Sequence, residues 1–132
     1  MRKTVLISAM IVIISCKQKN MEITSNSIGS YNLNQKVMKK NHEKNLEITL
    51  DDENKIKSII TRSNHYKTKE GFSVGTNLLN IEKLSKSQRR ELKVSKGSFQ
   101  IGNLGQIVIY KDISFVDENN DDKVDYIWIQ RK

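Results

Sequence analysis

A short apolar run near the N-terminus separates a predicted signal peptide from the part of the chain that is expected to fold. Residues 5–14 are apolar except for Ser8, and Arg2 and Lys3 precede them. A membrane-spanning helix needs about 20 apolar residues, so this run is too short to span a bilayer and is typical of a secretory signal peptide. Removal of residues 1–15 leaves 117 of the 132 residues. That length predicts one domain that is able to bury a core.

The end of the apolar run carries a resemblance. Residues 13–16 read Ile-Ile-Ser-Cys and resemble the lipobox of bacterial lipoproteins. The resemblance implies that Cys16 is lipid-modified, that the chain is cut just before it, and that it carries at least a diacylglyceryl group, which makes a stable anchor. Cys16 is also the only cysteine, so no internal disulfide can form. The alternative is an ordinary signal peptide that has a cysteine near its end by chance.

Residues 16–27 are expected to be the lipidated cysteine and a tether. They are polar apart from Cys16, Met21 and Ile23, as is typical of a linker. No acidic cluster follows Lys17, whereas some lipoproteins that move to the cell surface carry one there. We therefore expect the protein in the bacterial cell envelope, anchored in the outer membrane and facing the periplasm.

The charge of the chain bears on its partners. The net charge is +8, and it becomes +6 when Arg2 and Lys3 are removed with the signal. A basic surface is attracted to anionic headgroups. Nucleic acid is the other standard partner of a basic chain, but export and the lack of a nucleic-acid motif argue against it. No small-molecule substrate is evident either. We expect the membrane as a partner through Cys16, and another envelope protein as a possible second one.

A weak internal repeat organises the rest, residues 28–132. Residues 27–30 (Ser-Ile-Gly-Ser) match residues 73–76 (Ser-Val-Gly-Thr), and apolar positions coincide further along. This predicts half-repeats over about 28–62 and 74–130, although chance similarity of two amphipathic segments is the alternative. A Gly-Ser/Thr step allows a sharp turn followed by a helix cap. We therefore expect one helix over about 33–42 and another over about 77–91.

Alternating apolar residues predict strands after each helix. Leu46, Ile48 and Leu50 alternate with polar residues, which is typical of a half-buried strand. Further strands are expected over 55–62 and over several short segments between 92 and 130. The expected fold class is α+β, with one antiparallel sheet and two helices on one face, as a tandem repeat of a helix followed by a β-meander.

A second resemblance lies in the segment 66–76, which reads Tyr-Lys-Thr-Lys-Glu-Gly-Phe-Ser-Val-Gly-Thr. It resembles a stretch found in uncharacterised small exported bacterial proteins. The layout of residues 28–130 is also similar to that of the outer-membrane assembly lipoproteins of the BamE type and of β-lactamase inhibitor proteins. These modules bind other proteins, so the resemblance implies a binding role. It assigns no partner-contacting residue.

The segment 117–125 is the strongest candidate for a site. Asp117, Asn119 and Asp121 fall at positions 1, 3 and 5, Lys123 offers a backbone carbonyl at position 7, and Asp125 is at position 9. Hard cations prefer several oxygen ligands at such spacing. The segment resembles the Asp-x-Asn-x-Asp-Gly-x-x-Asp loops of calcium-binding repeats in exported proteins, so calcium is the expected ligand, with weak affinity.

The segment departs from that pattern at two positions. Asp122 replaces the usual glycine at position 6, although Asp tolerates left-handed geometry better than most residues. Position 12 is Trp128 and not a bidentate Glu, so the segment is not an EF-hand. The alternative is a polar hairpin turn, since Asp and Asn are good turn residues.

No motif for catalysis is present, and we expect no enzymatic activity. His42 and His65 lie outside any metal-ligand or nucleophile pattern. The leading expectation is a lipoprotein that binds another envelope protein. The alternatives are an immunity or inhibitor lipoprotein that neutralises a toxin or enzyme, and a calcium-binding module. A basic face on the second predicted helix is the candidate partner surface, formed by Lys83, Lys86, Arg89 and Arg90.

Overall fold

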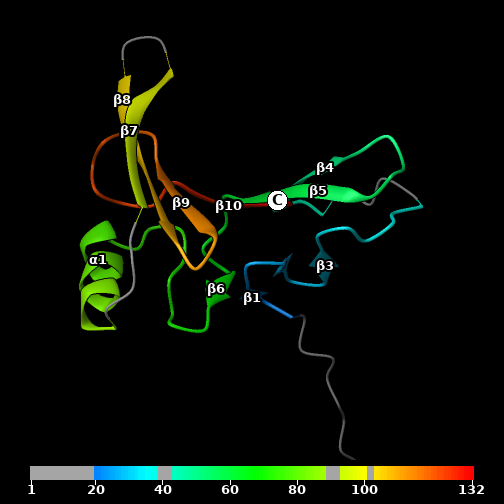
Figure 1. The fold of residues 1–132 in the computed structure, drawn as a ribbon, viewed down its shortest axis with the longest axis horizontal. Helices are drawn as coiled ribbons and strands as arrows, with labels where there is room; N and C mark the ends of the chain where they lie inside the picture. Colours follow the sequence, from blue (N-terminus) through cyan, green and yellow to red (C-terminus); the bar gives the residue numbers. More distant parts are fainter. Residues whose placement is uncertain (1–19, 39–42, 89–92, 101–102) are drawn as a thin grey trace, which may run out of the picture.

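The computed structural model describes residues 20–38, 43–88, 93–100 and 103–132, and they form two β-sheets and a helix (Figure 1). The larger sheet has six strands in the order β4-β5-β10-β9-β8-β7, and the smaller has four in the order β3-β2-β1-β6. The bounds of the larger sheet are β4 Leu46–Leu50, β5 Ile56–Thr61, β7 Lys93–Gln100, β8 Asn103–Tyr110, β9 Ile113–Asp117 and β10 Tyr126–Gln130. Those of the smaller sheet are β1 Glu22–Ile23, β2 Ser27–Ile28, β3 Tyr31–Asn32 and β6 Lys67–Thr68.

The core lies at the centre of the larger sheet. Strand β9 is buried along its whole length, and Ile127 and Ile129 of β10 are buried beside it. The Phe72 ring packs edge-on against Phe115 of β9, with centroids 5.9 Å apart. Apolar side chains at alternate positions of β10 point to one face, as expected for a strand with one buried side. The smaller sheet covers β5 and adds Ile23 and Ile28 to this core.

Helix α1 (Leu78–Ser87) packs against β8. The Asn77 side chain caps its N-terminus by accepting a hydrogen bond from the Leu79 N–H at 2.9 Å, which satisfies a donor that the helix leaves free. Leu78 and Ile81 are buried, and the Tyr110 hydroxyl of β8 lies 2.6 Å from Gln88 Oε1. Among the described residues, no helix has both the length and the apolar character needed to cross a membrane.

The expected fold class, an α+β sheet with two helices on one face, is wrong. The chain is mostly β, with two sheets and one helix in the part that the structure describes. Within the first expected helix, residues 33–38 are not helical, and residues 39–42 lie outside the described ranges. A tandem repeat of a helix followed by a meander therefore does not hold for the described residues of the first half.

Pairing with β5 explains why residues 33–38 are not helical. The Asn34 N–H donates to the Ile56 carbonyl at 2.7 Å, and the Ile56 N–H donates to the Gln35 carbonyl at 3.0 Å. Asn34 also has a φ of 67°, which no α-helix permits. Long-range strand pairing thus outweighs the helix-like spacing of Leu33, Val37 and Met38.

The fold also begins inside the stretch that the sequence predicts to be a tether. Strand β1 lies there, β2 starts at its last residue, and Ile23 is only 2% exposed. The Asn20 side chain donates to the Gly29 carbonyl at 3.0 Å, and its oxygen accepts from the Glu22 N–H at 3.0 Å. The described structure is therefore tied down from Asn20 onward.

Candidate metal centre

The candidate site is the loop that joins β9 to β10. Tyr126 pairs with Val116 at the loop end of this hairpin, and Asp117 and Asp125 are the next residues on the loop side of that pair. Asp117 is fully buried and Asp125 is partly buried. Two carboxylates facing each other across a strand pair repel, so the loop must supply positive charge or hydrogen-bond donors to hold them.

Three carboxylates of the loop converge. One oxygen each of Asp117, Asp121 and Asp125 can be chosen so that all three lie within 4.8 Å of one another. Calcium binds oxygen at 2.3–2.6 Å, so two of its ligands are at most about 5 Å apart. The three oxygens therefore fit around one calcium ion, and two of these residues are the first and last ligands of the predicted sequence pattern.

Hydrogen bonds hold the buried carboxylate of Asp117. It accepts from the N–H groups of Asp121 at 3.2 Å and Asp122 at 2.9 Å, and from Gln106 Nε2 of β8 at 3.0 Å. Burial by itself would raise the pKa of Asp117, but these hydrogen bonds outweigh it and the pKa is lowered. Asp117 is thus ionised at neutral pH, as a cation ligand must be.

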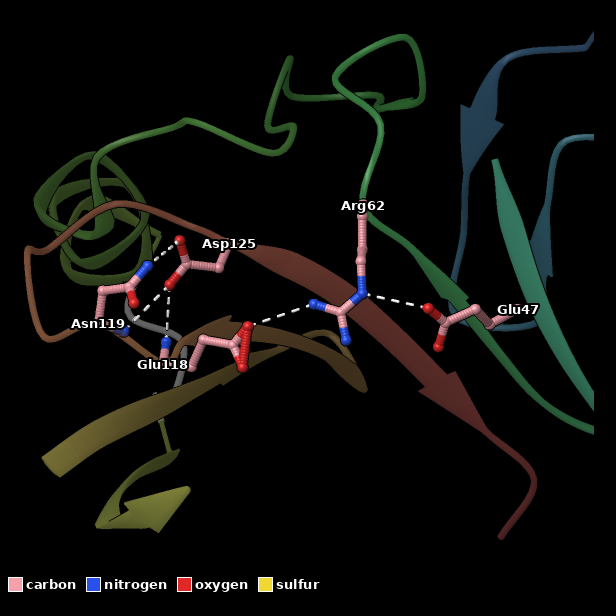
Figure 2. Close-up of polar contacts among 5 residues, drawn as sticks. All are labelled: Glu47, Arg62, Glu118, Asn119 and Asp125. Carbon is pink, nitrogen blue, oxygen red and sulfur yellow. Dashed lines mark hydrogen bonds and ion pairs between the residues drawn. The ribbon is translucent and has the colours of Figure 1, made fainter. Parts of the chain in front are cut away.

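Asp125 is held by the two residues at the start of the loop, Glu118 and Asn119 (Figure 2). Its Oδ2 accepts from the Glu118 N–H at 2.7 Å and the Asn119 N–H at 3.2 Å. Its Oδ1 accepts from Asn119 Nδ2 at 3.0 Å. An ionised carboxylate offers about four acceptor positions, so these contacts leave capacity for a cation. Asn119, at position 3 of the pattern, therefore contacts the cluster through its nitrogens and not through the amide oxygen that the pattern predicts as a ligand.

The backbone of the loop has the turn that the pattern needs. Asp122 has a φ of 63°, the left-handed conformation for which glycine is usual. Its side chain accepts from Gln106 Nε2 at 2.8 Å, and its carbonyl accepts from the Leu78 N–H at 2.8 Å. Lys123 forms a β-bridge with Asn77, and its N–H donates to Asp121 Oδ1 at 3.1 Å. The start of helix α1 therefore braces the loop.

Arg62 connects the loop to the far edge of the larger sheet (Figure 2). Its Nη1 lies 3.2 Å from Glu118 of the loop, and its Nε lies 3.1 Å from Glu47 of β4. The guanidinium carbon also lies 4.6 Å from the centre of the Tyr126 ring, a cation–π arrangement. These contacts fix Glu118 at the start of the loop. They thereby also position the Glu118 N–H, which donates a hydrogen bond to Asp125.

The other predicted site residues are not in this loop. Lys83 and Lys86 are exposed on α1. Arg89, Arg90 and Cys16 lie outside the described residues. Sequence reasoning missed Gln106 and Arg62. The only signal for Gln106 is one polar residue within an otherwise apolar stretch of β8, and for Arg62 there is none.

Comparisons of the chain with protein-family models, with curated proteins and with solved structures gave no match.

Proposed function

We propose that this chain is a lipid-anchored module of the bacterial envelope, without catalytic chemistry, whose β9–β10 loop binds calcium. The single observation that supports calcium binding is the convergence of the Asp117, Asp121 and Asp125 carboxylates within 4.8 Å. The lipobox-like residues 13–16 support the anchor.

Charge supplies the driving force for calcium binding. The loop carries five acidic residues in nine positions: Asp117, Glu118, Asp121, Asp122 and Asp125. The Arg62 guanidinium pairs with only one of them, Glu118. A divalent cation would relieve the repulsion among the remaining carboxylates. The site offers three converging carboxylate oxygens, and extracellular calcium-binding modules have affinities of about 0.1–1 mM.

Thermal melting in the presence of calcium tests this proposal. At about 5 mM calcium, a site of that affinity stabilises the folded chain by roughly 1–2 kcal/mol, which raises Tm by several degrees. Magnesium at the same concentration should give a smaller shift, because it prefers tighter octahedral geometry and keeps its waters. An unchanged Tm in calcium would overturn the proposal.

Two matched variants locate the effect. Asp121→Asn removes one exposed loop carboxylate and should abolish the calcium-dependent shift. Asp112→Asn removes an exposed carboxylate in the β8–β9 turn, where Asp112 pairs with Lys132, and should leave the shift intact. An equal loss of the shift in both variants would show that calcium acts through general surface charge.

The anchor has its own test. Cys16→Ser removes the only thiol and should move the protein from the membrane fraction to the soluble fraction. Labelling with a radioactive fatty acid should disappear at the same time. Retention of both the label and the membrane association in the Cys16→Ser protein would show that lipid is not attached at this residue.

A further inference from the structure

The larger sheet has two faces, and the described helix and smaller sheet cover only one of them (Figure 1). Leu78 of α1 and Ile28 of β2 belong to one core together with Ile127 of β10, so both coverings lie on the same side. Six apolar residues of the larger sheet alternate with its core residues and therefore point to the other face, and none of them belongs to that core. We call this the outer face, and it carries Ile60, Ile107, Ile109, Val116, Tyr126 and Trp128.

The central strands have the pattern of strands that are buried on both faces. A strand with one solvated face alternates apolar and polar residues, whereas a strand covered on both sides is a nearly continuous apolar run. Edge strand β4 follows the first pattern, with Glu47 and Thr49 exposed. Residues 126–129 of β10 read Tyr-Ile-Trp-Ile, and residues 107–110 of β8 read Ile-Val-Ile-Tyr. The outer face is therefore patterned for a covering layer that the described part of the chain does not supply.

One row of residues crosses the outer face from edge to edge. Residues directly opposite each other in a sheet lie on the same face, so the pairing registers define the row. In strand order, from β4 to β7, it is Glu47, Ile60, Trp128, Ser114, Ile109 and Lys93. The row has an acidic residue at one end, a basic residue at the other end and no charge between them.

We propose that the outer face packs against the outer face of a second copy of this chain, about a two-fold axis that runs parallel to the strands between β10 and β9. This rotation reverses the order of the strands but keeps the position of each residue along them. The row of one copy therefore lies over the reversed row of the other, with Trp128 over Ser114 and Ile60 over Ile109. A bulky aromatic side chain then faces a small one at the centre, where binding hot spots concentrate. The rotation also matches the twist of the two sheets, so facing strands stay aligned as in a β-sandwich.

Charge distinguishes this arrangement from the other symmetric one. With the axis parallel to the strands, Glu47 of each copy lies over Lys93 of the other, which gives two pairs of opposite charge. With the axis perpendicular to the strands, β4 lies over β4, so Glu47 meets Glu47 and Lys93 meets Lys93. Like charges that face each other across an interface are costly, so charge fixes the register. Glu47 is exposed, and its pair with Arg62 uses only Oε1, so its carboxylate can accept a second cation.

Chemical crosslinking in membranes of cells that express the full-length chain tests the packing. One tagged copy carries Ile60→Cys and a differently tagged copy carries Ile109→Cys. A bismaleimide with a spacer of about 10 Å, the distance between packed sheets, should link them into a mixed dimer. The matched control uses Ile60→Cys in both copies. The two cysteines are then displaced sideways by three strands, roughly 14 Å, and the yield should be several-fold lower. The unsubstituted chain reports any background from Cys16.

Charge exchange provides a readout that does not depend on how well a single variant folds. Glu47→Lys or Lys93→Glu, introduced into both copies of the 60–109 pair, should each lower the yield of the mixed dimer several-fold. The double variant Glu47→Lys/Lys93→Glu should restore it, which would support the proposed axis. The proposal is overturned if the 60–109 pair yields no more than the 60–60 control, if the double variant stays as low as the single ones, or if the Ile60→Cys copy is linked to a different protein instead.

Discussion

Gly29 and Gly75 occupy the same position in the two matching Gly-Ser/Thr steps, but their surroundings differ. Both have positive φ, 61° and 91°. A Cβ at Gly29 would lie 3.0 Å from the Asn20 carbonyl oxygen and 3.0 Å from the Tyr66 ring, whereas a Cβ at Gly75 would have nothing within 4 Å. Gly29 is therefore required both by its backbone conformation and by close packing, and Gly75 by conformation alone.

This difference predicts unequal costs of substitution. Gly75→Ala should lower the free energy of unfolding by about 1–2 kcal/mol, the cost of a left-handed conformation for a residue with a Cβ. Gly29→Ala should cost about 1–3 kcal/mol more, because backbone or ring must move to admit the methyl group. Urea unfolding of both variants at the same pH measures the difference. Equal losses would show that the contacts around Gly29 relax freely.

Only part of the candidate site could be predicted at the scale of residues. The spacing of Asp117, Asp121 and Asp125 is local, and it is these residues that the structure brings together. Gln106 could not be assigned, because its contact with Asp117 depends on the β8–β9 register. That register depends on which apolar side chains of the two strands become buried. Many alternative registers would bury similar apolar side chains, so the sequence does not single out one of them.

At the scale of elements, the turn of the β4–β5 hairpin is tied to the end of β10. Asp51 Oδ2 lies 2.7 Å from Arg131 Nη1, and Asp51 Oδ1 accepts from the N–H groups of Glu53 and Lys55, each at 2.9 Å. The hydrogen bond from Arg131, with help from these backbone donors, lowers the pKa of Asp51 to about 2 from its ordinary 3.8. The C-terminus is thereby fastened to a turn 80 residues earlier in the chain.

This contact predicts a loss of stability in acid. Because the pKa of Asp51 is lower in the folded chain, the unfolded chain binds the proton first, and the stabilisation is fully present above about pH 4 and is lost as the pH falls toward 2. Thermal melts between pH 7 and 2 should show a smaller acid-dependent fall in Tm for Asp51→Asn than for the parent chain.

Substitutions on the partner side separate this contact from general acid effects. Arg131→Gln should reduce the acid-dependent fall as Asp51→Asn does. The matched control is Lys132→Gln, which removes an adjacent cation from a more exposed ion pair with Asp112 and should leave the fall as large as in the parent. If all three variants behave alike, Asp51 is not the group responsible.

Elements with a local pattern could be predicted, and those that depend on distant partners could not. The alternation of Leu46, Ile48 and Leu50 predicted a strand, and β4 spans Leu46–Leu50. Leu33, Val37 and Met38 have a helix-like spacing, but their backbone pairs with the start of β5. Ile23 and Ile28 are isolated in a polar stretch, so their burial in strands of two residues has no periodic signal.

At the scale of the whole molecule, the arrangement of two sheets follows from pairings that the sequence does not encode locally. Strand β1 pairs in parallel with β6, which places Ile23 beside Thr68. Strand β5 pairs with β10, which brings Ile59 opposite Ile129. Each contact closes a long loop, and only the total burial of the apolar side chains decides among the alternatives. The sequence thus supports the presence of a sheet but not the division into two.

The hydrogen bonds of Asn20 also set how far the domain can stand from a bilayer. Asn20 is fixed to Gly29 and Glu22, and it follows Cys16 by four residues. A chain of that length spans at most about 14 Å. If Cys16 carries lipid, the domain is held close to the membrane surface and moves along it without reaching into the space beyond. Whatever the domain meets must then lie at that surface, so crowding in the leaflet, more than the amount of protein in the compartment, governs how often it is encountered.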